Sequence, residues 1–521
     1  MIPTRSRRRV QALAVASRAV ILTFVALVAS SIPASADAAR INVLPDTTTG
    51  IHIGVPFLRC YKGIWAPGSN NSPGCQASSL STQVAALRSS VDVGWMWTYG
   101  YVAPPRTGAP SSLAASYQID RAPGWEVDFT TGKSVPNTLA SMVAAHPDWI
   151  VYACDAQGTP TAPAWEYGDA PSTAASPAYI PLDITNPAVR DYMWNHYYKR
   201  SLDTGFPSLF FDNLSLHNFA HRCGHYDTSG NWIPMYSGTP AQQASQYKAQ
   251  VLDWLRYLRD KIHAYSPTAL LEVNYNPADG GDLATDYVQV YDIVDVVWNE
   301  AGFTDWGTKF ASTQSGFQAT LQADLAMSGR SDKALIVNAL VLPPGDTMNY
   351  TKVTPAQRLW AVGTYLLVKG AHTYTAVTTA EYGYFVDYPE YHINIGAPVD
   401  VAHQSQGAYV RTFTGGLVLV NPDAQKSITV QMTPGLYRGT DGAPVSSVVL
   451  PPTSASILVL YTQTTSATPT TNPTPPTTGA PPARRSRGRR TSAGGGAANS
   501  RHHRRRHRRH KRRFHRVSAR L

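Results

Sequence analysis

Two carboxylates follow apolar segments at positions where catalytic side chains are often found. Ser208–Phe211 is a mostly apolar run that stops at Asp212 and Asn213, and a second run, Val294–Trp298, leads through Asn299 into Glu300. Two carboxylates can divide one reaction between them, because one group donates a proton while the other attacks carbon or activates water. If the fold brings Asp212 and Glu300 together, the chemistry that they predict is cleavage of a bond such as a glycosidic linkage.

Amide and aromatic side chains near these carboxylates are typical of a saccharide site, since aromatic rings bind the apolar face of a sugar. We expect the following side chains to bind the substrate: Trp97, Tyr99, Asp155, Asn213, Asn274, Trp298, Asn299 and Asn338. Glu272 alternates with Asn274 along one strand and is a further candidate. A simpler interpretation exists for each, because a strand-end Asp often caps the next helix and most Trp and Tyr residues serve packing.

Eight short apolar runs alternate with segments of helical period and predict the elements that must position these residues. The expected strands are Ile51–Phe57, Val91–Tyr99, Trp149–Cys154, Ser208–Asp212, Ala269–Asn274, Ile293–Trp298, Ala334–Leu340 and Thr373–Val377. Apolar residues recur every three or four positions in 243–264, and Asn186-Pro187 is typical of a helix start. This alternation predicts an α/β fold, a (β/α)8 TIM barrel over residues 41–400. A doubly wound sheet is the alternative, although no glycine-rich phosphate loop follows any strand.

In such a barrel, catalytic groups lie at the carboxyl ends of the strands. Asp155, Asp212, Asn274 and Glu300 follow or end the third to sixth expected strands, and Asn338 lies in the seventh, so we expect them around one rim.

The chain after residue 403 has a different texture. Short β-type runs separated by Gly, Asn and Pro predict a small antiparallel β-sandwich over residues 404–463. Residues 464–521 form a Thr/Pro-rich linker and an Arg/His-rich tail, a composition that cannot bury a core and is expected to be disordered.

Charge is distributed unevenly along the chain. Residues 1–40 hold six of the 45 Lys and Arg residues and residues 464–521 hold sixteen, which leaves 23 for residues 41–463, against 33 of the 34 acidic residues. The body is therefore acidic, and the basic tail predicts a polyanionic cell-wall or surface partner. Specific nucleic-acid binding is not expected, because a nucleic-acid-binding domain usually carries positive charge on its folded face.

The N-terminus has the pattern of an export signal. Arginines precede an apolar run, and Ala34-Ser35-Ala36 offers the small residues of a cleavage site, so residues 1–36 are expected to be removed. A membrane anchor is the alternative, but the run is shorter than the roughly 20 residues that a span needs. We therefore expect a secreted or surface-associated protein with no transmembrane segment after processing.

Four cysteines suit an oxidising compartment. Cys60 and Cys75 flank a Pro/Gly/Asn-rich loop, which leaves Cys154 and Cys223 to pair with each other, although four cysteines permit three connectivities. No CxxC pair or close Cys/His spacing indicates zinc, and we expect no bound metal.

Several of these segments carry a resemblance to known families. Leu182–Arg190 with Phe210–Asn213 resembles a region of glycoside hydrolases related to the α-galactosidase superfamily. Trp298–Glu300, Tyr391–Gly396, Tyr409–Arg411 and Gly415–Pro422 are similar to hypothetical glycosyl hydrolase family 15. The resemblance implies a barrel with a C-terminal β-domain and a retaining mechanism, with Asp212 as nucleophile and Glu300 as acid/base.

The sequence thus favours a secreted glycoside hydrolase that acts on an α-linked saccharide and needs no cofactor. A non-catalytic carbohydrate-binding or surface protein on the same scaffold is the alternative. The residues leave open the sugar and linkage, endo or exo action, retaining or inverting stereochemistry, and the oligomeric state.

Overall fold

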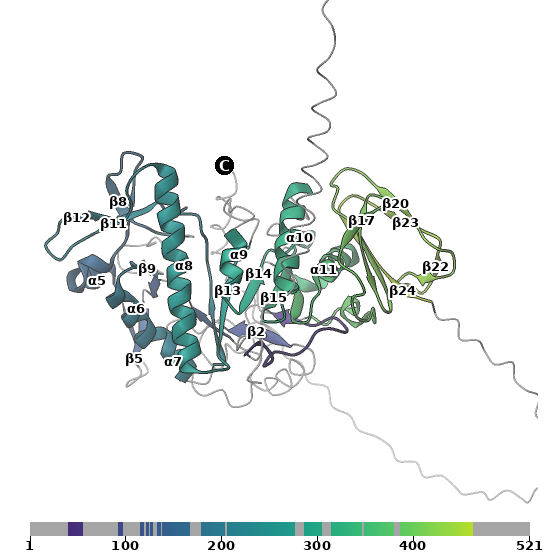
Figure 1. The fold of residues 1–521 in the computed structure, drawn as a ribbon, viewed down its shortest axis with the longest axis horizontal. Helices are drawn as coiled ribbons and strands as arrows, with labels where there is room; N and C mark the ends of the chain where they lie inside the picture. Colours follow the sequence, from purple (N-terminus) through teal and green to yellow (C-terminus); the bar gives the residue numbers. More distant parts are fainter. Residues whose placement is uncertain are drawn as a thin grey trace, which may run out of the picture. The chain divides into compact units, whose positions relative to one another are not determined.

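The structure is a computed structural model of the 521-residue chain (Figure 1). It describes residues 40–55, 92–96, 115–118, 121–123, 125–128, 133–136, 138–166, 179–203, 206–276, 286–304, 314–345, 349–379 and 386–461. Trp97, Tyr99, Cys60, Cys75, the expected export signal and the basic tail lie outside these residues.

A parallel sheet of eight strands forms the centre of the described chain. Its strands, in spatial order, are β1 (Gly54–Val55), β2 (Val93–Met96), β3 (Ala115–Gln118), β10 (Ser208–Phe211), β13 (Leu270–Asn274), β14 (Val296–Asn299), β15 (Ala334–Leu340) and β16 (Thr373–Thr378). Every pairing within it is parallel. Ile53, directly before β1, also forms a parallel bridge to Thr375 of β16, so the first and last strands meet there.

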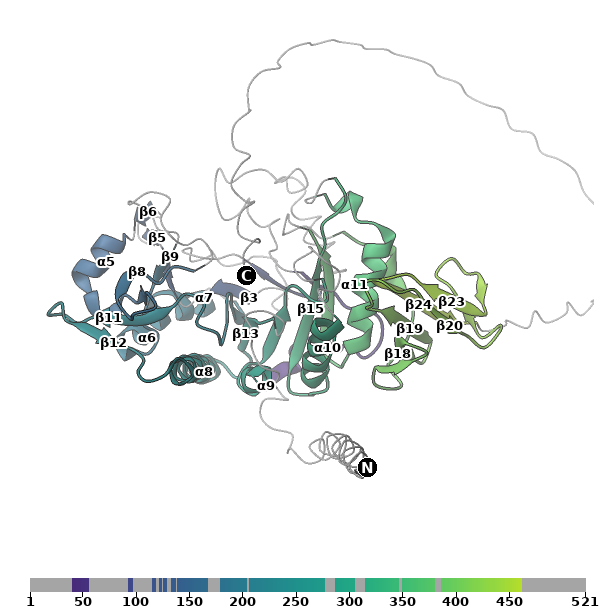
Figure 2. The ribbon, with the colours of Figure 1, turned by 90° about the horizontal axis from the view of Figure 1, so that it is seen from above.

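Helices cover one face of this sheet. In Figure 2, α8 (Pro240–Tyr265), α9 (Asp286–Tyr291) and α10 (Gln314–Ser328) lie along the strands, and α11 (Pro355–Val368) packs on β16. The shorter helical segments are α5 (Leu139–Ala145), η3 (Pro147–Trp149), α6 (Pro187–Met193), η4 (Trp194–Tyr198), α7 (Lys199–Asp203), η6 (Tyr350–Lys352) and η7 (Pro389–His392). The predicted helix start at Asn186 is confirmed, since its side chain caps α6 by accepting from the Ala188 N–H. The periodic segment 243–264 falls within α8, which begins earlier at a capping box formed by Thr239 and Gln242.

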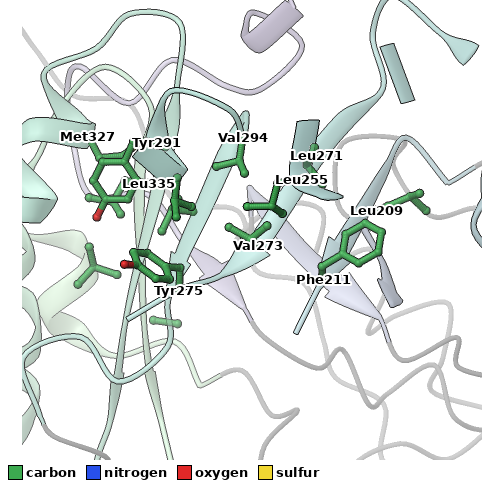
Figure 3. Packing of buried hydrophobic residues seen from close by; sticks show 14 of the residues in the cluster. Leu209, Phe211, Leu255, Leu271, Val273, Tyr275, Tyr291, Val294, Met327 and Leu335 are labelled. Atoms are coloured by element: carbon green, nitrogen blue, oxygen red, sulfur yellow. The ribbon is translucent and has the colours of Figure 1, made fainter. Parts of the chain in front are cut away.

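Strand side chains alternate between two apolar clusters. One cluster joins the sheet to the helices. Figure 3 shows Leu255 from α8 next to Leu271 and Val273 of β13, with Leu209 and Phe211 of β10 on one side and Leu335 of β15 on the other. The opposite face carries a second cluster that includes Phe210, Leu270, Val296, Trp298, Ile336 and Tyr374. A residue's position in this alternation therefore decides whether it faces the helices or the other side of the sheet.

One predicted strand was assigned to the wrong sheet. The third strand of the parallel sheet is β3, whereas β7 (Tyr152–Cys154), within the expected Trp149–Cys154 strand, joins an antiparallel sheet with β8 (Pro160–Pro163), β11 (Arg222–Tyr226) and β12 (Trp232–Pro234). The Ala-Ser-Tyr-Gln sequence of β3 contains only one large apolar residue, so hydrophobicity did not mark it. Two further pairs join β4 (Arg121–Pro123) to β9 (Tyr179–Pro181) and β5 (Trp125–Asp128) to β6 (Lys133–Pro136).

The antiparallel β-structure predicted after residue 403 is present. One sheet has six strands: β17 (His403–Ser405), β18 (Ala408–Phe413), β19 (Gly416–Asn421), β24 (Ser454–Leu460), β21 (Tyr437–Arg438) and β22 (Pro444–Val445); the other pairs β20 (Ile428–Gln431) with β23 (Ser447–Leu450). Val430 and Leu450 of the small sheet share an apolar core with Leu417, Leu419 and Leu458 of the large one. No helix in the described part of the chain is long and apolar enough to cross a membrane.

Candidate active site

Two carboxylates and one amide lie at the carboxyl ends of three neighbouring strands of the parallel sheet. β13 pairs with β10 on one side and with β14 on the other. Asp212 directly follows β10, Asn274 ends β13, and Glu300 directly follows β14. Each lies two residues beyond a side chain on the face away from the helices, namely Phe210, Glu272 or Trp298. The alternation thus turns all three toward that face.

The amide of Asn274 joins the two carboxylates. Its Nδ2 donates one hydrogen bond to Asp212 Oδ1 at 2.8 Å and one to Glu300 Oε2 at 2.5 Å. Because these distances add to 5.3 Å, the two acceptor oxygens can be no further apart than that. Asn274 is buried, whereas Asp212 and Glu300 are partly exposed. A fixed donor therefore holds two accessible carboxylates at short range.

The backbone after β10 provides a second hydrogen-bond donor to Asp212. The Asn213 N–H donates to Asp212 Oδ1 at 2.8 Å, and Asn213 itself has a φ of 60°. This left-handed conformation is one that Asn tolerates better than most residues.

A small cavity beside Asp212 brings in residues that the sequence analysis missed. Asp212, Asn213 and Ser215 line it together with Glu166 and side chains of α8. Glu166 is buried and accepts a 2.8 Å ion-pair contact from Arg222 of β11. Glu166 and Arg222 are 56 residues apart and follow no expected strand of the barrel, so no sequence pattern connected them to the site.

Glu272 lies one layer below Asn274 and is buried. Its two oxygens accept from Ser208 Oγ at 2.5 Å and from Trp298 Nε1 at 2.8 Å. Burial raises the pKa of this carboxyl to about 7, although both hydrogen bonds oppose that shift. Glu272 is therefore a buried residue beneath the site, and the candidate catalytic acids are Asp212 and Glu300.

Two residues beside Glu300 do not lie where we expected. The Trp298 ring is 1% exposed and packs edge-on against Phe210, so it presents no face to a sugar. Asn299 is fully buried and its amide donates to Asp324 of α10, on the helix side of the sheet. The expectation that these side chains bind substrate was wrong. Trp298 is on the same face of the sheet as Glu300 but is buried against Phe210, and strand alternation turns Asn299 toward the helices.

Asp155 was also placed wrongly, because its strand belongs to the antiparallel sheet. The side chain is exposed in the turn between β7 and β8, where it accepts from the backbone N–H groups of Gln157 and Thr159. Its role there is to close a turn.

Asn338 lies on the same face of the sheet as Ile336. It is fully buried, and within the described part of the chain neither its amide oxygen nor its amide nitrogen has a hydrogen-bond partner. Cys154 and Cys223 form the disulfide that links β7 to β11.

Among the described residues, no group of three or more His, Cys, Asp or Glu side chains could hold a metal ion.

Comparison with known proteins identifies a family for this chain. The model of the family described as hypothetical glycosyl hydrolase family 15 matches residues 126–417, more than half of the chain. No curated protein matches the sequence.

Similar solved structures include the maltogenic α-amylase from Thermotoga neapolitana (13% identity, TM-score 0.39, covering 79% of this chain and 99% of that one). The isomaltulose synthase from Klebsiella sp. LX3 has 13% identity and a TM-score of 0.45, covering 83% of this chain and 100% of that one. An α-amylase from Lactobacillus plantarum has 10% identity and a TM-score of 0.40, covering 82% and 100%. These similarities are too low to carry an argument about this chain.

Proposed function

Because the chain belongs to hypothetical glycosyl hydrolase family 15, we propose that it is a retaining glycoside hydrolase acting on α-linked saccharides through Asp212 and Glu300. The observation that carries this proposal is the shared amide of Asn274, which limits the separation of the two acceptor oxygens to 5.3 Å. Retaining enzymes hold their carboxyl groups about 5–5.5 Å apart, whereas inverting enzymes leave about 6.5–9.5 Å for a water molecule.

In the first step, Glu300 donates its proton to the glycosidic oxygen as the bond to the anomeric carbon breaks. A carboxylate oxygen of Asp212 attacks that carbon and forms a glycosyl ester. In the second step, Glu300 removes a proton from water, the water oxygen attacks the anomeric carbon, and Asp212 leaves as carboxylate. The two inversions restore the starting anomeric configuration.

The Asn274 amide and the Asn213 N–H have a defined part in this scheme. Both donate to the same oxygen of Asp212 and stabilise its charge when the ester forms and breaks. The amide also fixes the Glu300 carboxyl relative to the nucleophile, which lowers the entropic cost of reaching the transition state.

The wider architecture belongs to the same proposal. The parallel bridge between Ile53 and Thr375 supports a closed (β/α)8 barrel, and the shared core of the two C-terminal sheets supports a β-sandwich. The signal-like residues 1–36 and the basic residues 464–521 support export and attachment to an anionic surface.

The test is hydrolysis of a panel of aryl α- and β-glycosides and α-glucans by the purified protein, with the product anomer followed by proton NMR. We expect α-specific hydrolysis with retention, and about a 10²–10⁴-fold loss of kcat/KM on natural saccharides in Glu300→Gln. Asp212→Asn is expected to abolish turnover, and a 2-fluoro-glycosyl fluoride should label the peptide that contains Asp212. Asp260→Asn, an exposed acid on α8, is the matched control.

Inverted product would reject double displacement. Binding of saccharides without turnover across the panel would instead support the carbohydrate-binding alternative.

A further inference from the structure

The turn that carries Glu300 is closed by hydrogen bonds to Asn299, the residue before Glu300. The Gly302 N–H donates to the backbone oxygen of Asn299 at 3.2 Å and to its Oδ1 at 2.9 Å. After Glu300, Thr304 donates to the Ala301 carbonyl from its N–H at 3.0 Å and from its hydroxyl at 2.7 Å. The backbone on both sides of Glu300 is thus held by local hydrogen bonds.

The amide of Asn299 can adopt only one orientation in this turn. Its Nδ2 donates to the carboxylate of Asp324 at 3.0 and 3.3 Å, and both side chains are fully buried. A backbone N–H can only donate, so Gly302 requires the carbonyl Oδ1 on its side. The NH2 group is then left facing the Asp324 carboxyl.

The remaining sides of the turn are closed by packing. Gly302 has a φ of 52°, and a side-chain carbon there would collide with the carbonyl oxygen of Asn338 on β15. Trp360 of α11 donates from Nε1 to the carbonyl of Phe303 at 3.1 Å. The turn is therefore held by β15 and α11, and α10 contributes the Asp324 carboxyl and the ring of Phe317, whose centroid lies 5.1 Å from that of Phe303.

We propose that Asp324 is a positioning residue for Glu300: through Asn299 it sets the turn, and the turn sets the reach of the Glu300 carboxyl toward Asn274 and Asp212. Asp324 lies in the helix layer and makes its hydrogen bonds on the opposite face from the site, so it acts on the reaction only through this chain. The inference rests on the acid/base role proposed for Glu300.

The test separates acid catalysis from the rest of the reaction by varying the leaving group. An aglycone with a low pKa, such as dinitrophenol, departs without protonation, whereas an alkyl or sugar leaving group needs it. We expect Asp324→Ala and Asn299→Ala to lower kcat/KM about 10- to 100-fold on sugar leaving groups and less than threefold on dinitrophenyl glycosides. Glu300→Gln should show the same selectivity with a larger loss.

Two controls keep this result interpretable. Leu321→Ala removes a buried side chain of α10 one turn before Asp324, so it should lower the melting temperature. Any loss of kcat/KM in this variant should be equal on the two classes of substrate. Asp324→Glu retains the acceptor and is expected to recover part of the selectivity.

Equal losses on both leaving groups in Asp324→Ala, or none, would overturn the positioning role while leaving Glu300→Gln selective. If Glu300→Gln itself shows no dependence on the leaving group, the role proposed for Glu300 fails and the positioning proposal falls with it.

Discussion

At the scale of single residues, the amide of Asn274 is the group on which the site geometry depends. Replacing it with Ala removes the donor to both Asp212 and Glu300 and leaves two carboxylates close together without a bridge. We expect Asn274→Ala to lower kcat about 10²–10³-fold, the usual cost of losing one preorganised donor.

The matched control for Asn274→Ala is Asn421→Ala. Asn421 is also a buried Asn, and its amide donates to the carbonyls of Lys426, Leu450 and Pro451 in the C-terminal β-structure. It should cost stability and leave kcat unchanged. A wild-type kcat in Asn274→Ala would show that the bridge does not matter.

Glu272 gives the molecule a pH-dependent stability. Its pKa is about 7 in the folded state against 4.5 for the ordinary carboxyl, so folding favours the protonated form. This contribution is fully present below about pH 4.5 and is lost as the pH rises through 7, at a cost of about 3 kcal/mol.

The variant Glu272→Gln cannot ionise. We expect the free energy of unfolding of this variant to increase relative to that of wild type by up to about 3 kcal/mol between pH 5 and pH 8, as measured by urea denaturation. A constant difference between the two proteins across this range would contradict the raised pKa. Ser208→Ala, which removes one of the hydrogen bonds to Glu272, serves as a comparison that retains the titrating group.

Residue types at strand ends predicted the centre of the site but not its margins. Asp212, Asn274 and Glu300 were found because each follows a recognisable apolar strand, and their mutual contact follows from parallel pairing. Trp298 and Asn299 were misassigned because adjacency to Glu300 in sequence says nothing about the face of the strand. Glu166 and Arg222 come from outside the parallel sheet, and only tertiary packing brings them to Asp212.

At the scale of elements, the antiparallel sheet of β7, β8, β11 and β12 is the feature that sequence reasoning could not place. Its strand β7 belongs to an apolar segment that resembles a barrel strand, and hydrophobicity alone does not select the sheet that a strand joins. The sheet matters for the site because β11 carries Arg222, the partner of Glu166.

The disulfide between β7 and β11 is expected to hold this sheet in place. Cys154 and Cys223 are 69 residues apart, and closing a loop of that length typically stabilises a protein by about 2–4 kcal/mol. We expect the Cys154→Ala/Cys223→Ala variant to unfold at lower urea concentration and to show a higher KM. In a Cys60→Ala/Cys75→Ala background, where Cys154 and Cys223 are the two remaining cysteines, dithiothreitol should reproduce both effects. Unchanged stability of the Cys154→Ala/Cys223→Ala variant would contradict the prediction.

At the scale of the whole molecule, charge is divided between an acidic body and a basic tail. Residues 41–463 carry 23 basic and 33 acidic side chains, whereas residues 464–521 carry sixteen basic and no acidic ones. We therefore expect attraction to a polyanion to come from the tail, because the body carries a net negative charge. The composition of the chain predicted this division directly, since it depends on residue counts and not on packing.

A chain ending at residue 462 tests this division. On immobilised heparin, used as a polyanion, we expect the full chain to bind at low salt and elute as ionic strength rises, and the shortened chain to pass through. Because Asp212, Asn274 and Glu300 all precede residue 462, kcat/KM on a small aryl glycoside should be the same for both chains. On a substrate attached to an anionic surface, only the full chain should gain from local concentration, and salt should remove that gain. Heparin binding by the shortened chain would place the basic surface on the body instead, which would contradict an anchoring role for the tail.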